Sequence, residues 1–224
     1  MDEAISELMA ANLAFVGTHF AMSHPLRAPL VKLLGNAGFQ IAYSLVSFAA
    51  LAWVWFAFRA APSADLPGSG EIGWVIATLL TLPALILFAG SMIGNPAMPT
   101  PKAEQQALAE PTGVFRVTRH PMMWGFALWA ASHMILFWSM RTMVTAFAMG
   151  FLALVGAHMQ DLKKQRLMGD AWEAWQAKTS FWPQWTAIFG AGAMPWTLGL
   201  ILFVFLSWLH LPVGGIPAGI WRWF

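Results

Sequence analysis

The sequence contains no cysteine, a single tyrosine and few charged residues. Without cysteine the chain has no disulfide bond, no thiolate-bound metal or iron–sulfur cluster, and no heme attached or ligated through a thiol. Charged residues make up 10% of the 224 residues, whereas soluble proteins contain about 25%. Because the net charge is only +2, the chain lacks the strongly basic surface that binds nucleic acid, and we expect no nucleic-acid partner.

Hydrophobic residues, by contrast, make up 58% of the chain, which includes 14 tryptophans and 17 phenylalanines. The chain has only 12 basic and 10 acidic side chains. These are too few to form a water-facing surface around so many apolar residues. The composition therefore predicts a single integral membrane domain over residues 1–224. For an apolar, aromatic bundle of this kind we expect membrane lipid and a lipophilic small-molecule substrate as partners.

Long intervals without charge mark the segments that can cross a bilayer, because a crossing helix needs roughly 20 mostly apolar residues. The first interval opens on acidic residues, so we expect it to be retained and not cleaved as a signal peptide. We predict an all-α, polytopic transmembrane helix bundle of about six spans, near Ala4–Met22, Ile41–Phe58, Ile72–Met92, Pro121–Met140, Thr142–Met159 and Met194–Leu211.

Two connecting segments have a character of their own. Asn95–Thr118 contains four prolines and is predicted to be an irregular connection. Lys163–Lys178 is predicted to be an interfacial amphipathic helix on the membrane surface, with Trp172 and Trp175 facing lipid.

Lysines and arginines are distributed unevenly between the two sides of this predicted bundle. One side would hold nine of them, and the other only Arg59, Arg141 and Arg222. Since cytoplasmic loops carry the excess of positive charge, we expect a bacterial-type inner (cytoplasmic) membrane protein with both termini outside the cytoplasm.

Six histidines are the main candidates for chemistry, because the predicted spans hold no Lys, Arg, Asp or Glu well inside them. An imidazole in lipid needs a partner, so it is a functional candidate by default. His133 is the most deeply placed, and His19 lies one turn from the cytoplasmic end of the first span. A helix–helix hydrogen bond for His133 and contact with interfacial water for His19 are the structural alternatives. The other expectations are His24 in a loop, His158 paired with Asp161, and His210 inert at the outer boundary.

Arg119, His120 and Pro121 stand at the start of the fourth predicted span. Proline is favourable in the first helical turn, and an arginine and a histidine beside it can hold a propionate, phosphate or carboxylate. The alternative role of this pair is a positive anchor at the cytoplasmic face. Buried neutral imidazoles, basic residues and no thiols are together compatible with heme b in a helical bundle.

Separated motifs also occur in a defined order along the chain, over roughly residues 15–185. They are Thr18–Arg27, Gly35, Gly38–Ser47, Asn95–Pro96, Gly113–Trp129, His133, Asp161, Lys163 and Gly169–Trp172. Together they resemble the membrane proteins of the NnrU family. That family is similar to plant and cyanobacterial zeta-carotene isomerase, which uses heme b to isomerise a cis double bond of a carotenoid, and its name links it to denitrification and nitric oxide. The resemblance implies a heme-dependent, isomerase-like protein.

The resemblance also implies a set of site residues. His19 and His133 would be the axial ligands of one heme b iron, with His133 the ligand central to catalysis, and Arg119 and His120 would lie near the cofactor, Arg119 beside a propionate. By helix rise the two ligand histidines lie about 10 Å apart in depth. His120 or His158 therefore stays open as the partner of His133.

Two other functions stay open at this point. Arg119-His120-Pro121 with Gly125 also resembles a motif of membrane methyltransferases of the isoprenylcysteine and phospholipid type, which use S-adenosylmethionine. Met123 stands where that motif has an aromatic residue, and Gln160-Asp161 stand where it has paired glutamates, so this function ranks lower. A non-catalytic heme sensor is the other alternative.

Overall fold

The computed structural model describes residues 2–224, and no β-strand occurs in that range. The all-α fold class is confirmed. The described range contains six long helices and five short elements. The long helices are α1 (Glu3–Ser23), α2 (Arg27–Ala60), α3 (Gly70–Gly90), α5 (Pro121–Leu136), α6 (Met140–Met168) and α8 (Ala193–Gly214), and the short elements are α4 (Ala103–Leu108), α7 (Asp170–Lys178) and the 3-10 helices η1 (Gly113–Arg116), η2 (Trp185–Gly190) and η3 (Gly219–Arg222).

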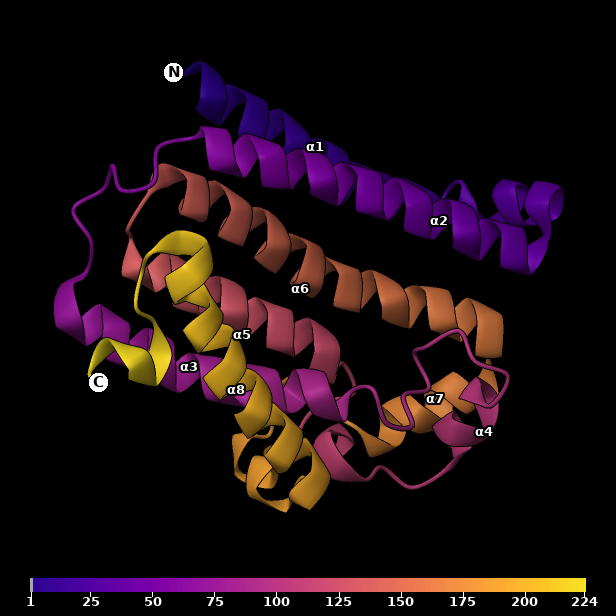
Figure 1. Ribbon diagram of the computed structural model, residues 1–224. Helices are drawn as coiled ribbons and strands as arrows, with labels where there is room; N and C mark the ends of the chain where they lie inside the picture. The colour runs from indigo at the N-terminus through magenta and orange to yellow at the C-terminus, as the bar shows by residue number, and fades with distance from the viewer. Residues whose placement is uncertain (1) are drawn as a thin grey trace.

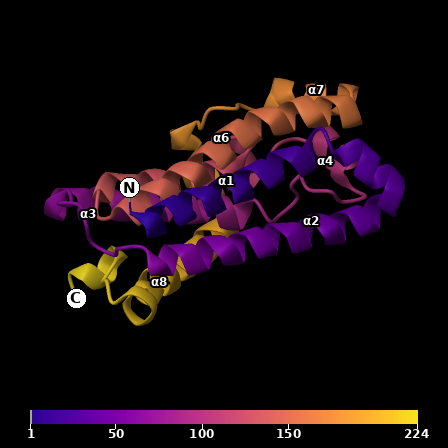
Figure 2. The ribbon, with the colours of Figure 1, turned by 90° about the horizontal axis from the view of Figure 1, so that it is seen from above.

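The long helices pack side by side with α6 in the middle of the bundle (Figure 1). The antiparallel pair α1 and α2 lies on one side of α6, while α5 lies on the other side and packs on α3. Helix α8 packs against α3, and the view from above places it on the same side of the bundle as α2 (Figure 2). Both chain ends lie at one end of the bundle, and α4 and α7 lie at the opposite end (Figure 1).

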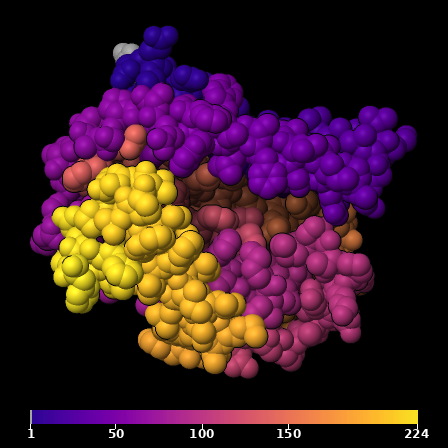
Figure 3. All heavy atoms as spheres, viewed as in Figure 1, coloured from indigo at the N-terminus to yellow at the C-terminus, as the bar shows by residue number. Residues whose placement is uncertain are grey.

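Among residues 2–224, four helices (α2, α3, α6 and α8) are long and apolar enough to cross a membrane. Large apolar side chains are exposed along α2 and α8, for example Phe48, Phe56 and Phe205, and these two helices dominate one face of the molecule (Figure 3). A membrane protein is therefore supported. The predicted count of six is confirmed only in part, because α1 and α5 are not among these four helices.

Helix α5 is shorter than the predicted span Pro121–Met140. It ends at Leu136 because Phe137 takes a left-handed conformation with φ 46°. Its 16 residues extend only about 24 Å at 1.5 Å per residue, less than the roughly 30 Å of a hydrocarbon core. His133 consequently lies in the last turn of α5 and not near the middle of a crossing helix.

Helix α2 begins well before the predicted span Ile41–Phe58. It starts at Arg27 and consists of two helical pieces that meet at Gly35, whose φ of 71° and ψ of 172° are not helical. A positive φ is accessible to glycine without a steric penalty from Cβ. The residues from Arg27 to Ile41, which lie outside the predicted span, are therefore helical apart from Gly35.

The predicted surface helix Lys163–Lys178 is divided between two elements. Helix α6 continues to Met168, Gly169 reverses the chain with φ 52°, and α7 packs against α4. Trp172 and Trp175 are buried, with 0% and 2% of their surface exposed, so the prediction that they face lipid is wrong. The reversal at Gly169 turns them onto a protein core that includes Phe115. The connection Asn95–Thr118 is irregular as predicted, apart from α4 and η1.

Candidate functional site: an apolar cavity and three histidine environments

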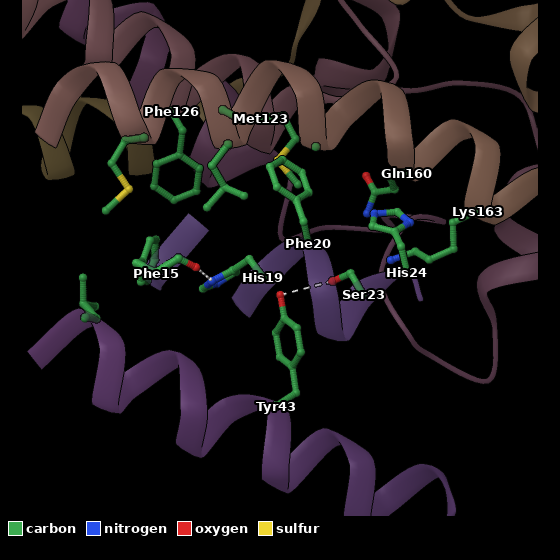
Figure 4. A pocket seen from close by; sticks show the side chains of 15 residues that line it. Phe15, His19, Phe20, Ser23, His24, Tyr43, Met123, Phe126, Gln160 and Lys163 are labelled. Carbon is green, nitrogen blue, oxygen red and sulfur yellow. Dashed lines mark hydrogen bonds between the residues drawn. The ribbon is translucent and has the colours of Figure 1, made fainter. Parts of the chain in front are cut away.

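A cavity of about 370 Å³ lies between α1, α2, α5 and α6 (Figure 4). Most of its wall is apolar and comes from Phe15, Leu51, Phe126, Met149 and Leu152. Its polar side chains come mainly from α1, α2 and the far part of α6, and none of the lining residues is acidic. They are His19, Ser23, His24, Tyr43, Gln160 and Lys163.

His19 presents an unpaired ring nitrogen at this cavity. Its Nδ1 lies 2.7 Å from the carbonyl oxygen of Phe15. A carbonyl only accepts hydrogen bonds, so Nδ1 carries the proton and Nε2 the lone pair. The ring packs edge-on against Tyr43 with centroids 5.5 Å apart, and the Ser23 hydroxyl donates to the Tyr43 oxygen at 3.5 Å.

The polar end of the cavity is positively charged. Lys163 and His24 both line it, and Figure 4 shows their side chains close to Gln160. Burial lowers the pKa of His24, and the charges of Lys163 and Arg166 lower it further. His24, which lies just beyond α1, is thereby kept neutral near pH 7, and Lys163 supplies the charge at this end.

His133 is not among the residues that line the cavity. Its Nδ1 lies 2.8 Å from the carbonyl oxygen of Trp129, and its ring lies 4.3 Å from the Trp129 ring. Across from it, on α8, stands His210, with ring centroids 6.1 Å apart. The pairing of His19 with His133 on one iron stays a prediction, and the proximity of His210 was missed because 77 residues separate the two histidines in the chain.

Arg119 and His120 form a separate buried network around Asp161. Arg119 donates three hydrogen bonds to the carboxylate at 2.8–3.1 Å, and His120 Nε2 lies 2.9 Å from its Oδ1. The indole N–H of Trp172 donates to the same oxygen at 3.2 Å. To bind a propionate, Arg119 would first have to release Asp161. The sequence did not predict that Trp172 belongs to this network, because its spacing from Trp175 indicated only the lipid-facing side of a surface helix.

The network also corrects the predicted pairing of His158 with Asp161. His158 is exposed on α6 and forms no hydrogen bond or ion pair with any of residues 2–224. The Asp161 side chain is directed to the start of α5 and to α7 instead. Gln160, the preceding residue, lines the cavity. Gln160 and Asp161 thus serve different environments, whereas the methyltransferase alternative needs two acidic groups at one site.

Comparison with known proteins decides the family. The family described as NnrU protein matches residues 7–218. The chain belongs to the NnrU family. This NnrU-family chain is 31% identical over 86 residues to a protein named "15-cis-zeta-carotene isomerase, chloroplastic" from Zea mays, an alignment that covers 38% of the chain and 23% of the maize protein. No solved structure matches this NnrU-family chain.

The histidines of this NnrU-family protein suit a heme iron in their chemistry. Nδ1 of His19, His133 and His210 each donates to the carbonyl four residues earlier. This tautomer leaves Nε2 with the lone pair that ligates a metal, and the second hydrogen bond fixes the ring. Within residues 2–224 no group of three or more His, Asp or Glu side chains is placed to hold a metal ion. A heme iron needs only two axial protein ligands.

Proposed function

We propose that this protein binds heme b and isomerises a cis double bond of a lipophilic polyene within the membrane. The observation that carries the proposal is the aromatic-walled cavity with the unpaired Nε2 of His19. A polyene offers a long π-face and few hydrogen-bonding groups, and Phe15 and Phe126 provide matching π-surfaces in the wall. The name of the maize protein gives the same class of substrate and reaction.

The cavity suits a reaction that moves no atoms between molecules. Rotation about a double bond needs neither water nor a nucleophile, and the apolar walls from Leu51, Met149 and Leu152 keep water away. The charge of Lys163 makes one end of the cavity unfavourable for apolar groups. The apolar part of a substrate is therefore directed to the opposite end. Heme b, if bound, would supply an iron centre that interacts with an electron-rich double bond.

His133 would hold the heme iron, because its Nε2 is free and its Nδ1–H is fixed on Trp129. The family resemblance assigns the second iron ligand to His19. Nitric oxide also binds heme iron, which would give the denitrification link of the family's name a physical basis. Arg119 and His120 position the start of α5, and thereby His133, through Asp161.

A matched pair of substitutions on α6 tests the role of the cavity. Ala153 lines the cavity and is 3% exposed, whereas its neighbour Leu154 is 39% exposed and does not line it. We expect Ala153→Phe to lower turnover of a 15-cis carotene by heme-loaded protein at least tenfold, because the ring fills the substrate space. Leu154→Phe should retain turnover. Equal activity of the two variants would contradict the proposal, as would absence of a Soret band from the purified wild type.

A further inference from the structure

The polar end of the cavity between α1, α2, α5 and α6 carries hydrogen-bond donors without partners. The side chains of His24, Gln160 and Lys163 line this end and form no hydrogen bond or ion pair with any of residues 2–224. We infer that this end binds the carboxylate of a single-chain amphiphile, whose apolar chain lies along the aromatic part of the wall. The inference rests on the proposed function, because it makes the polyene substrate a carboxylic acid.

Lys163 is a half-buried cation without a counter-ion. The next residue, Lys164, is buried, donates to the carbonyl oxygen of Pro96 at 3.0 Å and does not line the cavity. Asp161, two residues before Lys163, is already engaged in the buried network described above. Lys163 is therefore available to pair with an anion that enters the cavity.

Two arginines add to the positive charge beside the cavity, which has no acidic side chain in its wall. Arg27, the first residue of α2, lies close enough to Lys163 for the two charges to repel each other. Arg166 lies one turn beyond Lys163 on α6, and its charge reaches His24. Neither arginine forms an ion pair within residues 2–224. The positive potential of such a cluster attracts an anion to this end.

The neutral donors around Lys163 favour a carboxylate over a phosphate. The Tyr43 oxygen accepts a hydrogen bond from Ser23, so its own O–H is free to donate, and the Gln160 amide and neutral His24 supply N–H groups (Figure 4). A carboxylate accepts several hydrogen bonds and carries one negative charge, which Lys163 balances. A phosphate monoester carries about −1.5 to −2 and would need a second cation in the wall.

The cavity has the shape of an extended chain. On α6 its lining extends from Met149 to Lys163, a length of about 21 Å at 1.5 Å per residue. A volume of about 370 Å³ spread over this length makes the cavity elongated, which suits one chain and not two. Leu51 and Phe126, both 41% exposed, belong to its wall, so a chain can enter from the lipid side of the bundle.

The charged end also lies where a membrane amphiphile carries its head group. Lys163 is five residues from the end of α6, at the end of the bundle that holds α4 and α7 (Figure 1). The apolar lining residues Met149 and Leu152 lie closer to the middle of α6. Because a charge at the bilayer centre is costly, an amphiphile keeps its head at the interface and its chain inward, which is the orientation that this cavity offers.

Equilibrium binding of a polyene acid and of its neutral ester tests the inference. The probe is cis-parinaric acid, a fluorescent fatty acid with conjugated double bonds, added to the full chain in a neutral detergent, and energy transfer from tryptophan reports binding. The methyl ester has the same chain without the charge. The variants are Lys163→Gln, the charge-retaining Lys163→Arg and, as a control with an exposed lysine outside the cavity, Lys102→Gln.

We expect Lys163→Gln to raise the Kd of the acid about tenfold or more, because a charge-assisted hydrogen bond is lost. The same substitution should leave the Kd of the ester within about twofold of the wild-type value. Lys163→Arg should recover most of the affinity for the acid, and Lys102→Gln should bind both probes as the wild type does. Ala153→Phe, which fills the cavity, should weaken the binding of acid and ester alike.

The outcomes separate the inference from the proposed function. An unchanged affinity of Lys163→Gln for the acid would overturn the inference and reduce Lys163 to an interfacial anchor. An equal loss of affinity for acid and ester would overturn it as well, because the charge of the head group would then play no part. Retained binding of both probes by Ala153→Phe would refute the location. A wild type that has neither a Soret band nor turnover of a 15-cis carotene would remove the proposed function, while charge-dependent binding of the acid would still establish the carboxylate site.

Discussion

Replacing Asp161 by asparagine keeps the shape of the side chain but removes the negative charge on which five hydrogen bonds converge, from Arg119, His120 and Trp172. The side chains of Arg119 and Asp161 are only 13% and 8% exposed, so water screens the pair little. Breaking a buried ion pair by removing one partner costs about 3–5 kcal/mol, because the other charge stays buried without a counter-ion. For a chain of this length that corresponds to a fall in Tm of about 6–20 °C.

Thermal unfolding followed by tryptophan fluorescence in detergent at pH 7.5 measures this difference. Glu110→Gln is the matched control, because it removes the same charge from an ion pair with Lys178 in which the glutamate is 81% exposed. Exposed pairs contribute about 0–1 kcal/mol, so the control should melt within about 4 °C of the wild type. An Asp161→Asn protein that melts together with the control would refute the role given to the network.

Three further predictions concern packing, pH and topology. Gly199→Ala should lower the free energy of unfolding by about 1–3 kcal/mol, because the new Cβ would lie 2.8 Å from Cα of Ile86. Gly156→Ala is the control and should not lower it, because a Cβ at Gly156 meets nothing within 4 Å. Equal melting temperatures of the two variants would refute the close contact of α3 and α8. Below about pH 6.5 His24 is protonated in the unfolded state, whereas its lowered pKa keeps it neutral in the folded state. The free energy of unfolding therefore falls as the pH falls. His24→Gln should lose less stability than the wild type between pH 7.5 and 5.5, and an identical loss would contradict the prediction. A reporter fused after Lys102 should indicate the cytoplasm and one fused at Phe224 the opposite side, as the excess of lysine and arginine predicts; the reverse result would refute the topology.

The long helices could be predicted because an uncharged interval of sufficient length is a local property of the sequence. The end of α5 could not, because it depends on the left-handed conformation of Phe137, which no residue type at that position signals. Trp172 looked like a lipid-facing residue for a similar reason. Its actual partner, Asp161, reaches it only through the reversal of the chain at Gly169.

Some site residues could be predicted from a local motif, and others depend on how the helices pack. The motif Arg119-His120-Pro121 indicated a functional position, and with the other motifs it led to the NnrU family, which the match over residues 7–218 confirms. Its partner Asp161 and the neighbour of His133, His210, follow from how α5, α6 and α8 pack. Packing of this kind depends on contacts between residues 41–77 positions apart, and spacing along one chain does not reveal them.

The Asp161 network also has a consequence for biosynthesis. Arg119 leaves the ribosome before its partner Asp161 and before Trp172, which donates to Asp161 and follows Arg119 by 53 residues. At a synthesis rate of about 5–20 residues per second, roughly 3–10 s pass between the synthesis of Arg119 and that of Trp172. During that interval a helix of 16 residues, too short to cross the bilayer core unaided, depends on its contact with α3, which is already synthesised. The order of the chain thus lets α3 and α5 pack together before Asp161 and Trp172 are made, and we expect completion of α7 to fix the start of α5.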